Sequence, residues 1–172
     1  REKFDKNDIV FEDKDLFIIN KNSWINVHSW DHKTNEANVI NIVQDYLWEK
    51  LNSLTFKPSL IHRIDRDTSG ILMIWKTKSI LSKLVTDLKN HEKVKKTYYA
   101  IVLWKLSRKN WTINKKLLRI ENAKNENKVQ VSDSWKEAIT HYKFLKEHSL
   151  KTKEWLQILT EVEVKIETWR MH

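Results

Sequence analysis

The residues best suited to chemistry lie together in one segment, His62-Arg63-Ile64-Asp65-Arg66-Asp67-Thr68-Ser69-Gly70. It combines two carboxylates with two guanidinium groups, an imidazole and two hydroxyls, and it ends on the only glycine of the chain. The apolar run 71–74 follows at once and predicts a buried strand. A charged loop held by a rigid strand is a typical place for an active site, although most charged clusters are solvated turns.

The two carboxylates of this segment suggest acid–base chemistry. Asp65 and Asp67 are two residues apart, so an extended backbone would place both on one face, as in some hydrolases. Arg63 and Arg66 beside them favour the ionised form, which suits a nucleophile or a permanent charge better than a general acid. Asp67 is more simply explained as a turn former. His62 is either a ligand or base or, as is more common, a hydrogen-bonded structural histidine.

A second group of candidates lies in the strand predicted at 97–103. Tyr98 and Tyr99 are adjacent, so their rings point to opposite faces. One ring belongs to the core and the other can stack on a ligand, unless both only pack. The preceding basic cluster, 93–96, is either a solvated patch or a phosphate contact.

The elements that must hold these residues follow from hydrophobic periodicity. A charged turn at 12–15 joins two short strands between Asp8 and Asn20. Residues 36–50 place apolar side chains on one helical face, and Asn35 or Thr34 can cap this helix. Further elements are expected as a helix after Ser79, a strand at 97–103, a hairpin over 112–130 and alternating strands at 138–147 and 156–164. Together they predict one α+β domain over 1–172, with a mixed, largely antiparallel sheet and flanking helices.

The composition narrows the class of partner. The net charge of +9 favours a polyanion, with nucleic acid ahead of an acidic membrane surface. No apolar stretch approaches the length that crosses a bilayer. The absence of cysteine excludes disulfides and thiolate-bound zinc and suits a reducing cytoplasm. The seven histidines are scattered without His-Glu-x-x-His spacing, so the sequence leaves a metal site open but does not support one.

Tryptophan and glycine occur in unusual proportion, with nine Trp against one Gly. A domain with many turns needs residues that tolerate positive φ, and glycine normally supplies them. Tryptophan instead stands at several turn-like places, namely Trp24, Trp30, Trp111 and Trp135.

Residues 62–70 resemble the signature His-Arg-Leu-Asp-x-x-Thr-Ser-Gly of the RluA-type pseudouridine synthases, with Ile64 in place of leucine. Three further segments resemble motifs of this family in the family's order. Phe11–Lys21 is similar to its entry strand and Asn-Lys-Pro, and Lys96–Val102 to its Lys-x-Tyr-x-Ala-x-Val. Residues 167–172 are similar to the start of its Thr-Gly-Arg-x-His-Gln-Ile-Arg. The resemblance therefore spans nearly the whole chain.

The resemblance implies the pseudouridine synthase catalytic fold and a role for each matching residue. Asp65 is the expected catalytic aspartate, and Tyr98 the tyrosine packed against the target base. Arg63 is expected to occupy the space that the flipped uridine leaves, and His62 and Arg170 to contact the RNA. The implied reaction breaks the C1′–N1 bond of uridine, rotates the uracil and rejoins it through C5, without a metal or cofactor. Whether Asp65 attacks or deprotonates the nucleotide stays open.

Tryptophan stands where the family has glycine. Such a residue at a positive-φ turn costs up to a few kcal/mol. We hypothesise that UGA codons read as glycine by some bacteria have been translated here as tryptophan. The positions concerned are Trp24, Trp30, Trp104, Trp135 and Trp169.

The resemblance also concerns the ends and the partners of the chain. The family's Gln-Ile-Arg, whose arginine pairs with the catalytic aspartate, would follow His172, so the catalytic domain over 1–172 is expected to be incomplete at its C-terminus and inactive or poorly folded by itself. An S4-type domain has room before Arg1. The expected substrate is large-subunit ribosomal RNA, with tRNA as the alternative, and the expected state is a cytoplasmic monomer without membrane contact. Two other functions are a catalytically silent RNA-binding module on the same fold and a carboxylate-pair hydrolase.

Overall fold

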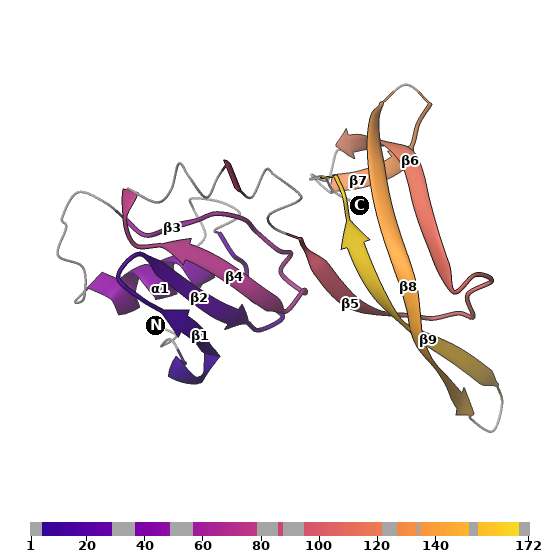
Figure 1. Ribbon diagram of the computed structural model, residues 1–172, viewed down its shortest axis with the longest axis horizontal. Helices are drawn as coiled ribbons and strands as arrows, with labels where there is room; N and C mark the ends of the chain where they lie inside the picture. The colour runs from indigo at the N-terminus through magenta and orange to yellow at the C-terminus, as the bar shows by residue number, and fades with distance from the viewer. Residues whose placement is uncertain are drawn as a thin grey trace. The chain divides into compact units, whose positions relative to one another are not determined.

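The computed structural model describes residues 5–28, 37–48, 57–78, 86–87, 95–121, 127–133, 135–151 and 155–168 (Figure 1). The chain divides into two compact units, Arg1–Lys89 and Asn90–His172, and each contains its own sheet. Strand pairing within both sheets is antiparallel. The predicted α+β class, with largely antiparallel sheets, is confirmed. Most of the helix predicted after Ser79 lies outside the described residues.

In the part of the chain that the structure describes, the first unit consists of a four-stranded sheet with one α-helix against it. After a short 3-10 helix, Lys6–Asp8, its elements are β1 (Ile9–Glu12), β2 (Leu16–Lys21), α1 (Val39–Trp48), β3 (Ser59–Leu60) and β4 (Gly70–Trp75), and the strand order is β1-β2-β4-β3. The predicted pair of strands is therefore present. Asp13 closes the charged turn between them, because its Oδ1 accepts the N–H groups of Asp15 and Leu16 at 2.8 and 2.7 Å. These bonds lower the pKa of Asp13.

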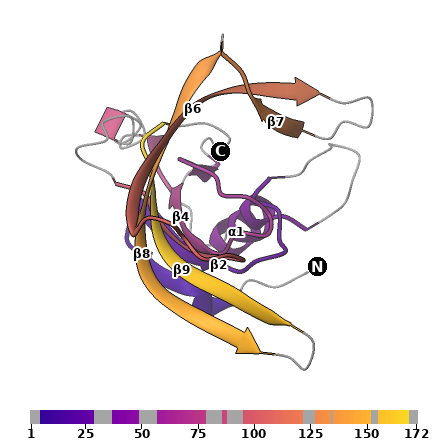
Figure 2. The same ribbon diagram turned by 90° about the vertical axis from the view of Figure 1, so that its right-hand side faces the viewer.

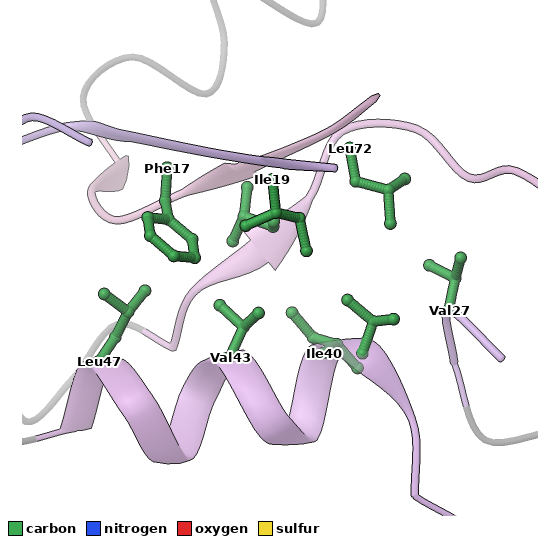
Figure 3. Packing of buried hydrophobic residues seen from close by; sticks show 9 residues of the cluster. Phe17, Ile19, Val27, Ile40, Val43, Leu47 and Leu72 are labelled. Atoms are coloured by element: carbon green, nitrogen blue, oxygen red, sulfur yellow. The ribbon is translucent and has the colours of Figure 1, made fainter. Parts of the chain in front are cut away.

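The core of this unit lies between α1 and one face of the sheet. Phe17 and Ile19 of β2 point toward Val43 and Leu47 of α1, as Figure 3 shows, together with Leu72 of β4. Alternate residues of a strand share a face, and residues four apart share one side of a helix. The two apolar rows therefore meet, and burial of each large side chain contributes about 1.5–3 kcal/mol. This core holds β2 and β4, from which the candidate loops emerge.

The start of α1 differs from the prediction. The helix begins at Val39, and the Oδ1 of Asn38 accepts the N–H of Asn41 at 3.0 Å. Asn38 is therefore the cap, and the predicted caps Asn35 and Thr34 lie outside the described residues. The N–H of Val39 donates to the carbonyl of Asn26 at 2.9 Å, so a distant segment satisfies one of the donors that every helix start leaves open.

The second unit is a five-stranded sheet in the order β5-β9-β8-β6-β7. Its strands are β5 (Thr97–Val102), β6 (Asn110–Glu121), β7 (Asn127–Val131), β8 (Lys136–Lys151) and β9 (Leu156–Ile166). Figure 2 shows β8 and β9 running side by side along a pronounced curve. The predicted strands and the hairpin are confirmed, with β8 longer than expected. The register of β8 and β9 shifts between Phe144 and Lys146, as at a β-bulge, which increases strand twist.

Candidate active site

Residues 62–69 lie in the loop that joins β3 to β4 in the first unit, and Gly70 is the first residue of β4. Ile64 is partly buried and packs against the hydrophobic core. Arg63 and Asp65, on either side of it, are both exposed. Because Ile64 is anchored in the core while both of its neighbours are exposed, the loop presents the Arg63 guanidinium and the Asp65 carboxylate to solvent. The loop backbone next to Asp65 is therefore anchored to the hydrophobic core through Ile64.

A tight turn follows the carboxylate. The N–H of Thr68 donates to the carbonyl of Asp65 at 3.2 Å, which closes the turn across Arg66 and Asp67. Gly70 then enters β4 with a φ of 131°. A Cβ added there would meet no heavy atom within 4 Å, so the backbone angle rather than space calls for glycine.

Lys21 ties this loop to the loop after β2. Its side chain is buried, and its Nζ donates to the carbonyls of Asn22, Ile25 and Arg66 at 2.8, 3.1 and 2.9 Å. Burial lowers the pKa of Lys21, and the nearby carboxylates of Asp67 and Asp65 act in the opposite direction. The sequence argument missed this residue as a site residue. Two features of the sequence could have indicated it: Lys21 ends a mostly apolar strand, and Asn20-Lys21 matches the Asn-Lys of the family motif.

The loop after β2 contains the residue with the most unusual backbone of the described chain. Trp24 has a φ of 71°, and among the described residues it alone has positive φ without being glycine. Its ring is 72% exposed, and its carbonyl accepts the Nε–H of Arg66 at 3.3 Å. Trp24 thus has the backbone expected of a glycine. Trp104 and Trp135 do not have positive φ, so that part of the expectation is wrong, and Trp30 and Trp169 lie outside the described residues.

The histidine at the end of the loop after β2 is affected by the charge of Arg63. Burial and the guanidinium of Arg63 together lower the pKa of His28, which favours its neutral imidazole. His62 is half-buried directly before Arg63. His62, Arg63 and Asp65 therefore lie within four successive residues of one loop, while Arg170 lies outside the described residues.

Tyr98 and Tyr99 belong to the second unit, and they lie on opposite faces of its sheet. Tyr98 is half-buried on β5 and pairs in register with Val164 of β9. Tyr99 is 62% exposed on the opposite face, and its hydroxyl donates to Glu161. This bond raises the pKa of Tyr99 and lowers that of Glu161. Of the two rings, Tyr98 stands on the face that carries Val162 and Val164.

The described parts of the chain contain no group of three or more His, Cys, Asp or Glu side chains that could hold a metal ion. Among the same residues, no helix is both long and apolar enough to cross a membrane.

The comparisons with known proteins cover nearly all of the chain. Residues 15–172 match the family model described as RNA pseudouridylate synthase. The ribosomal large subunit pseudouridine synthase C of Buchnera aphidicola subsp. Baizongia pistaciae is 36% identical over 148 residues, which are 85% of this chain and 44% of that protein. A Bacillus subtilis protein described as an uncharacterized RNA pseudouridine synthase is 32% identical over 168 residues, 96% of this chain and 51% of its own. The chain thus spans about half the length of such relatives.

The fold is also similar to that of solved structures. Human RNA pseudouridylate synthase domain containing 4 superposes with a TM-score of 0.69 over 96% of this chain and 61% of its own, at 20% identity. This similarity concerns the fold alone. The match of the family model over residues 15–172, with the relatives above, assigns the chain to the RNA pseudouridylate synthase family.

Proposed function

We propose that this protein converts uridine to pseudouridine in RNA and that its substrate is large-subunit ribosomal RNA. The family match over 15–172 supports the reaction, and the names of several relatives, which are ribosomal large subunit pseudouridine synthases, support the substrate. The net charge of +9 suits a polyanionic partner. The same proposal makes the protein a monomer in the cytoplasm, where ribosomal RNA is modified.

In this proposal Asp65 is the catalytic aspartate. The reaction breaks the bond between C1′ and N1 and forms one between C1′ and C5. In the net reaction C5 loses one proton and N1 gains one. Only the carboxylate that faces the nucleotide can take part in these steps. The observation that carries the assignment is the exposed Asp65, held beside an Ile64 that packs against the core.

The remaining roles follow from the matching motifs. Arg63 fills the space that the flipped uridine vacates, and its exposure two residues before Asp65 is compatible with this role. Tyr98 stacks on the target base, which agrees with its place on the apolar face of β5. His62 and Arg170 contact the RNA.

The test compares two isosteric variants in the complete protein that contains this chain. Purified wild type, Asp65→Asn and Asp67→Asn are incubated with a transcript of large-subunit ribosomal RNA, and pseudouridine is quantified chromatographically after nuclease digestion. We expect wild type to form pseudouridine, Asp65→Asn to form none, and Asp67→Asn to stay within a few-fold of wild type. Asp67 serves as the matched control because it lies in the same exposed turn.

Each other outcome points to a different function. Pseudouridine formation by Asp65→Asn would overturn the catalytic assignment. RNA binding without pseudouridine in wild type would identify a silent binding module, and shortened RNA that depends on both carboxylates would identify a hydrolase.

A further inference from the structure

The positive charge of the chain is concentrated in the second unit, Asn90–His172. Over residues 1–89 the basic and acidic side chains are nearly equal in number, so almost all of the net charge of +9 belongs to the second unit. Within that unit, the segment from Lys93 to Ile120 contains no Asp or Glu. A surface with one sign of charge attracts a polyanion, and the proposed function supplies one in RNA.

Two cations of this segment lie over aromatic rings. In the loop between β5 and β6, the guanidinium carbon of Arg108 lies 3.6 Å from the ring centroid of Trp111. The Nζ of Lys109 lies 5.8 Å from the ring centroid of Phe144. Both basic residues are exposed, and among the residues that the structure describes neither forms an ion pair with a carboxylate. A cation over a ring keeps its outward N–H groups for another acceptor.

The backbone that carries these two cations is attached to the sheet. The hydroxyl of Tyr142 donates to the carbonyl of Arg108 at 3.2 Å, and the N–H of Phe144 donates to the carbonyl of Lys109 at 2.6 Å. Both donors belong to β8, so the two cations have a defined position before any ligand binds. Preorganisation of this kind reduces the entropy lost on binding.

The aromatic rings near these cations lie on the sheet face that carries Tyr98. Tyr98 pairs in register with Val164, Val164 with Tyr142, and Tyr142 with Trp111. Residues directly opposite each other in antiparallel strands share a face, so Tyr98, Tyr142 and Trp111 form one aromatic row across the sheet. Three strand spacings separate the backbones at the two ends of this row by about 14 Å. Arg108 lies over the ring at its far end.

We propose that the aromatic row, with Arg108 and Lys109, binds an unpaired segment of the substrate RNA next to the target uridine. This inference rests on the proposed function, in which Tyr98 stacks on the target base. The other two rings, Tyr142 and Trp111, stack on bases of the neighbouring nucleotides, and the two cations contact their phosphates. An unpaired segment is required because the bases of a duplex are stacked on one another and cannot reach these rings.

The opposite face of the same sheet provides a matched control. Lys143 directly follows Tyr142 on β8, and adjacent residues of a strand point to opposite faces, so its side chain points away from the aromatic row. Lys143 and Lys146 both pair in register with glutamates of β9 on that opposite face, and both lysines are exposed. Lys143→Gln/Lys146→Gln therefore removes the same charge as Arg108→Gln/Lys109→Gln.

The first experiment measures RNA binding separately from turnover. The complete protein that contains this chain carries Asp65→Asn in every sample, so that no pseudouridine forms. Fluorescence anisotropy gives the Kd for a labelled single-stranded oligonucleotide of large-subunit ribosomal RNA sequence and for its duplex, at several salt concentrations.

We expect Arg108→Gln/Lys109→Gln to reduce the slope of log Kd against log salt concentration by about 1.4, because each phosphate contact on a single strand contributes about 0.7. This contribution vanishes at 1 M salt, so the same slope corresponds to a Kd about 25-fold higher at 0.1 M salt. The control pair should change the Kd by less than about threefold, and the duplex should bind more weakly than the single strand.

An unchanged slope in Arg108→Gln/Lys109→Gln, an equal loss in both double variants, or equally tight binding of the duplex would overturn the proposal. The proposed function fails separately. If the protein without Asp65→Asn binds single-stranded RNA through these two cations but forms no pseudouridine, the interaction surface stands and the synthase assignment does not.

A crosslinking measurement on wild type keeps the test independent of how the variants fold. The oligonucleotide carries 5-iodouridine beside the target position, which on irradiation couples to an adjacent aromatic ring, and the crosslinked peptides are identified by mass spectrometry. We expect crosslinks at Tyr142 or Trp111. Crosslinks at Tyr99 instead, which is 62% exposed on the opposite face, or no crosslink at either ring of the row, would contradict the proposal.

Discussion

The strongest stability prediction concerns the backbone of Trp24. At a φ of 71°, an L-residue brings its Cβ close to the following carbonyl oxygen, at a cost of about 1–2 kcal/mol. Glycine has no Cβ and avoids this cost, although it loses more chain entropy on folding, about 0.5–1 kcal/mol. The indole ring is 72% exposed, so its removal sacrifices little packing. We therefore expect Trp24→Gly to raise the free energy of unfolding by about 1 kcal/mol.

The control for this prediction is Trp24→Ala. Alanine removes the ring as glycine does but keeps the Cβ at the same positive φ. The difference between the two variants therefore isolates the backbone strain from the loss of the indole. Trp111→Gly is a second control, because Trp111 is exposed within the extended strand β6, where glycine is unfavourable.

The assay is urea denaturation of the three variants and wild type, followed by far-ultraviolet circular dichroism. We expect Trp24→Gly to be more stable than Trp24→Ala by about 1 kcal/mol, and Trp111→Gly to be less stable than wild type by about 0.5–1 kcal/mol. Equal stability of the glycine and alanine variants at position 24 would refute the strain argument, because the two differ there only in the Cβ and its backbone freedom.

Four further predictions can be measured directly. Sequencing of the gene is expected to show UGA at Trp24, and UGG there would end the recoding hypothesis. Leu47→Ala should lower the free energy of unfolding by about 2–5 kcal/mol in thermal or urea melts, because Leu47 is fully buried against the sheet. Thr160→Val should cost about 1 kcal/mol in the same melts, because the buried Thr160 hydroxyl donates to the Trp104 carbonyl at 2.8 Å. Burial lowers the pKa of Lys96 from 10.5 to about 8. Between pH 8 and 10.5 the unfolded state therefore binds more protons than the folded state, and the free energy of unfolding should rise with pH. Lys96→Met should remove that part of the pH dependence.

Much of the fold could be read from local sequence because its cause is local. Alternating apolar residues predicted the antiparallel strands β8 and β9, and adjacent positions placed Tyr98 and Tyr99 on opposite faces, as the sheet confirms. The charged turn after β1 was equally readable, since the side chain of Asp13 accepts hydrogen bonds from backbone groups two and three residues away. These features need no distant partner.

The candidate site was located by sequence but not explained by it. The segment 62–70 carries its own chemistry and family signature, whereas the direction of the Asp65 carboxylate depends on Ile64 entering a core built from β2, β4 and α1. The helix cap was mispredicted for the same kind of reason. The first turn of α1 is satisfied partly by the carbonyl of Asn26, a residue outside the window in which capping signals are read.

By itself the sequence determined which residues carry charge and rings, where the chain extends or coils, and that glycine is missing where turns require it. Only the tertiary structure decided which of the turn-like tryptophans it describes has a positive φ, namely Trp24. It also decided that Lys21, an ordinary polar end of a strand by pattern, is buried and bonded to a carbonyl 45 residues away. Backbone angles at turns and long-range hydrogen bonds depend on how the whole chain closes, because the free energy that holds them comes from contacts between distant segments.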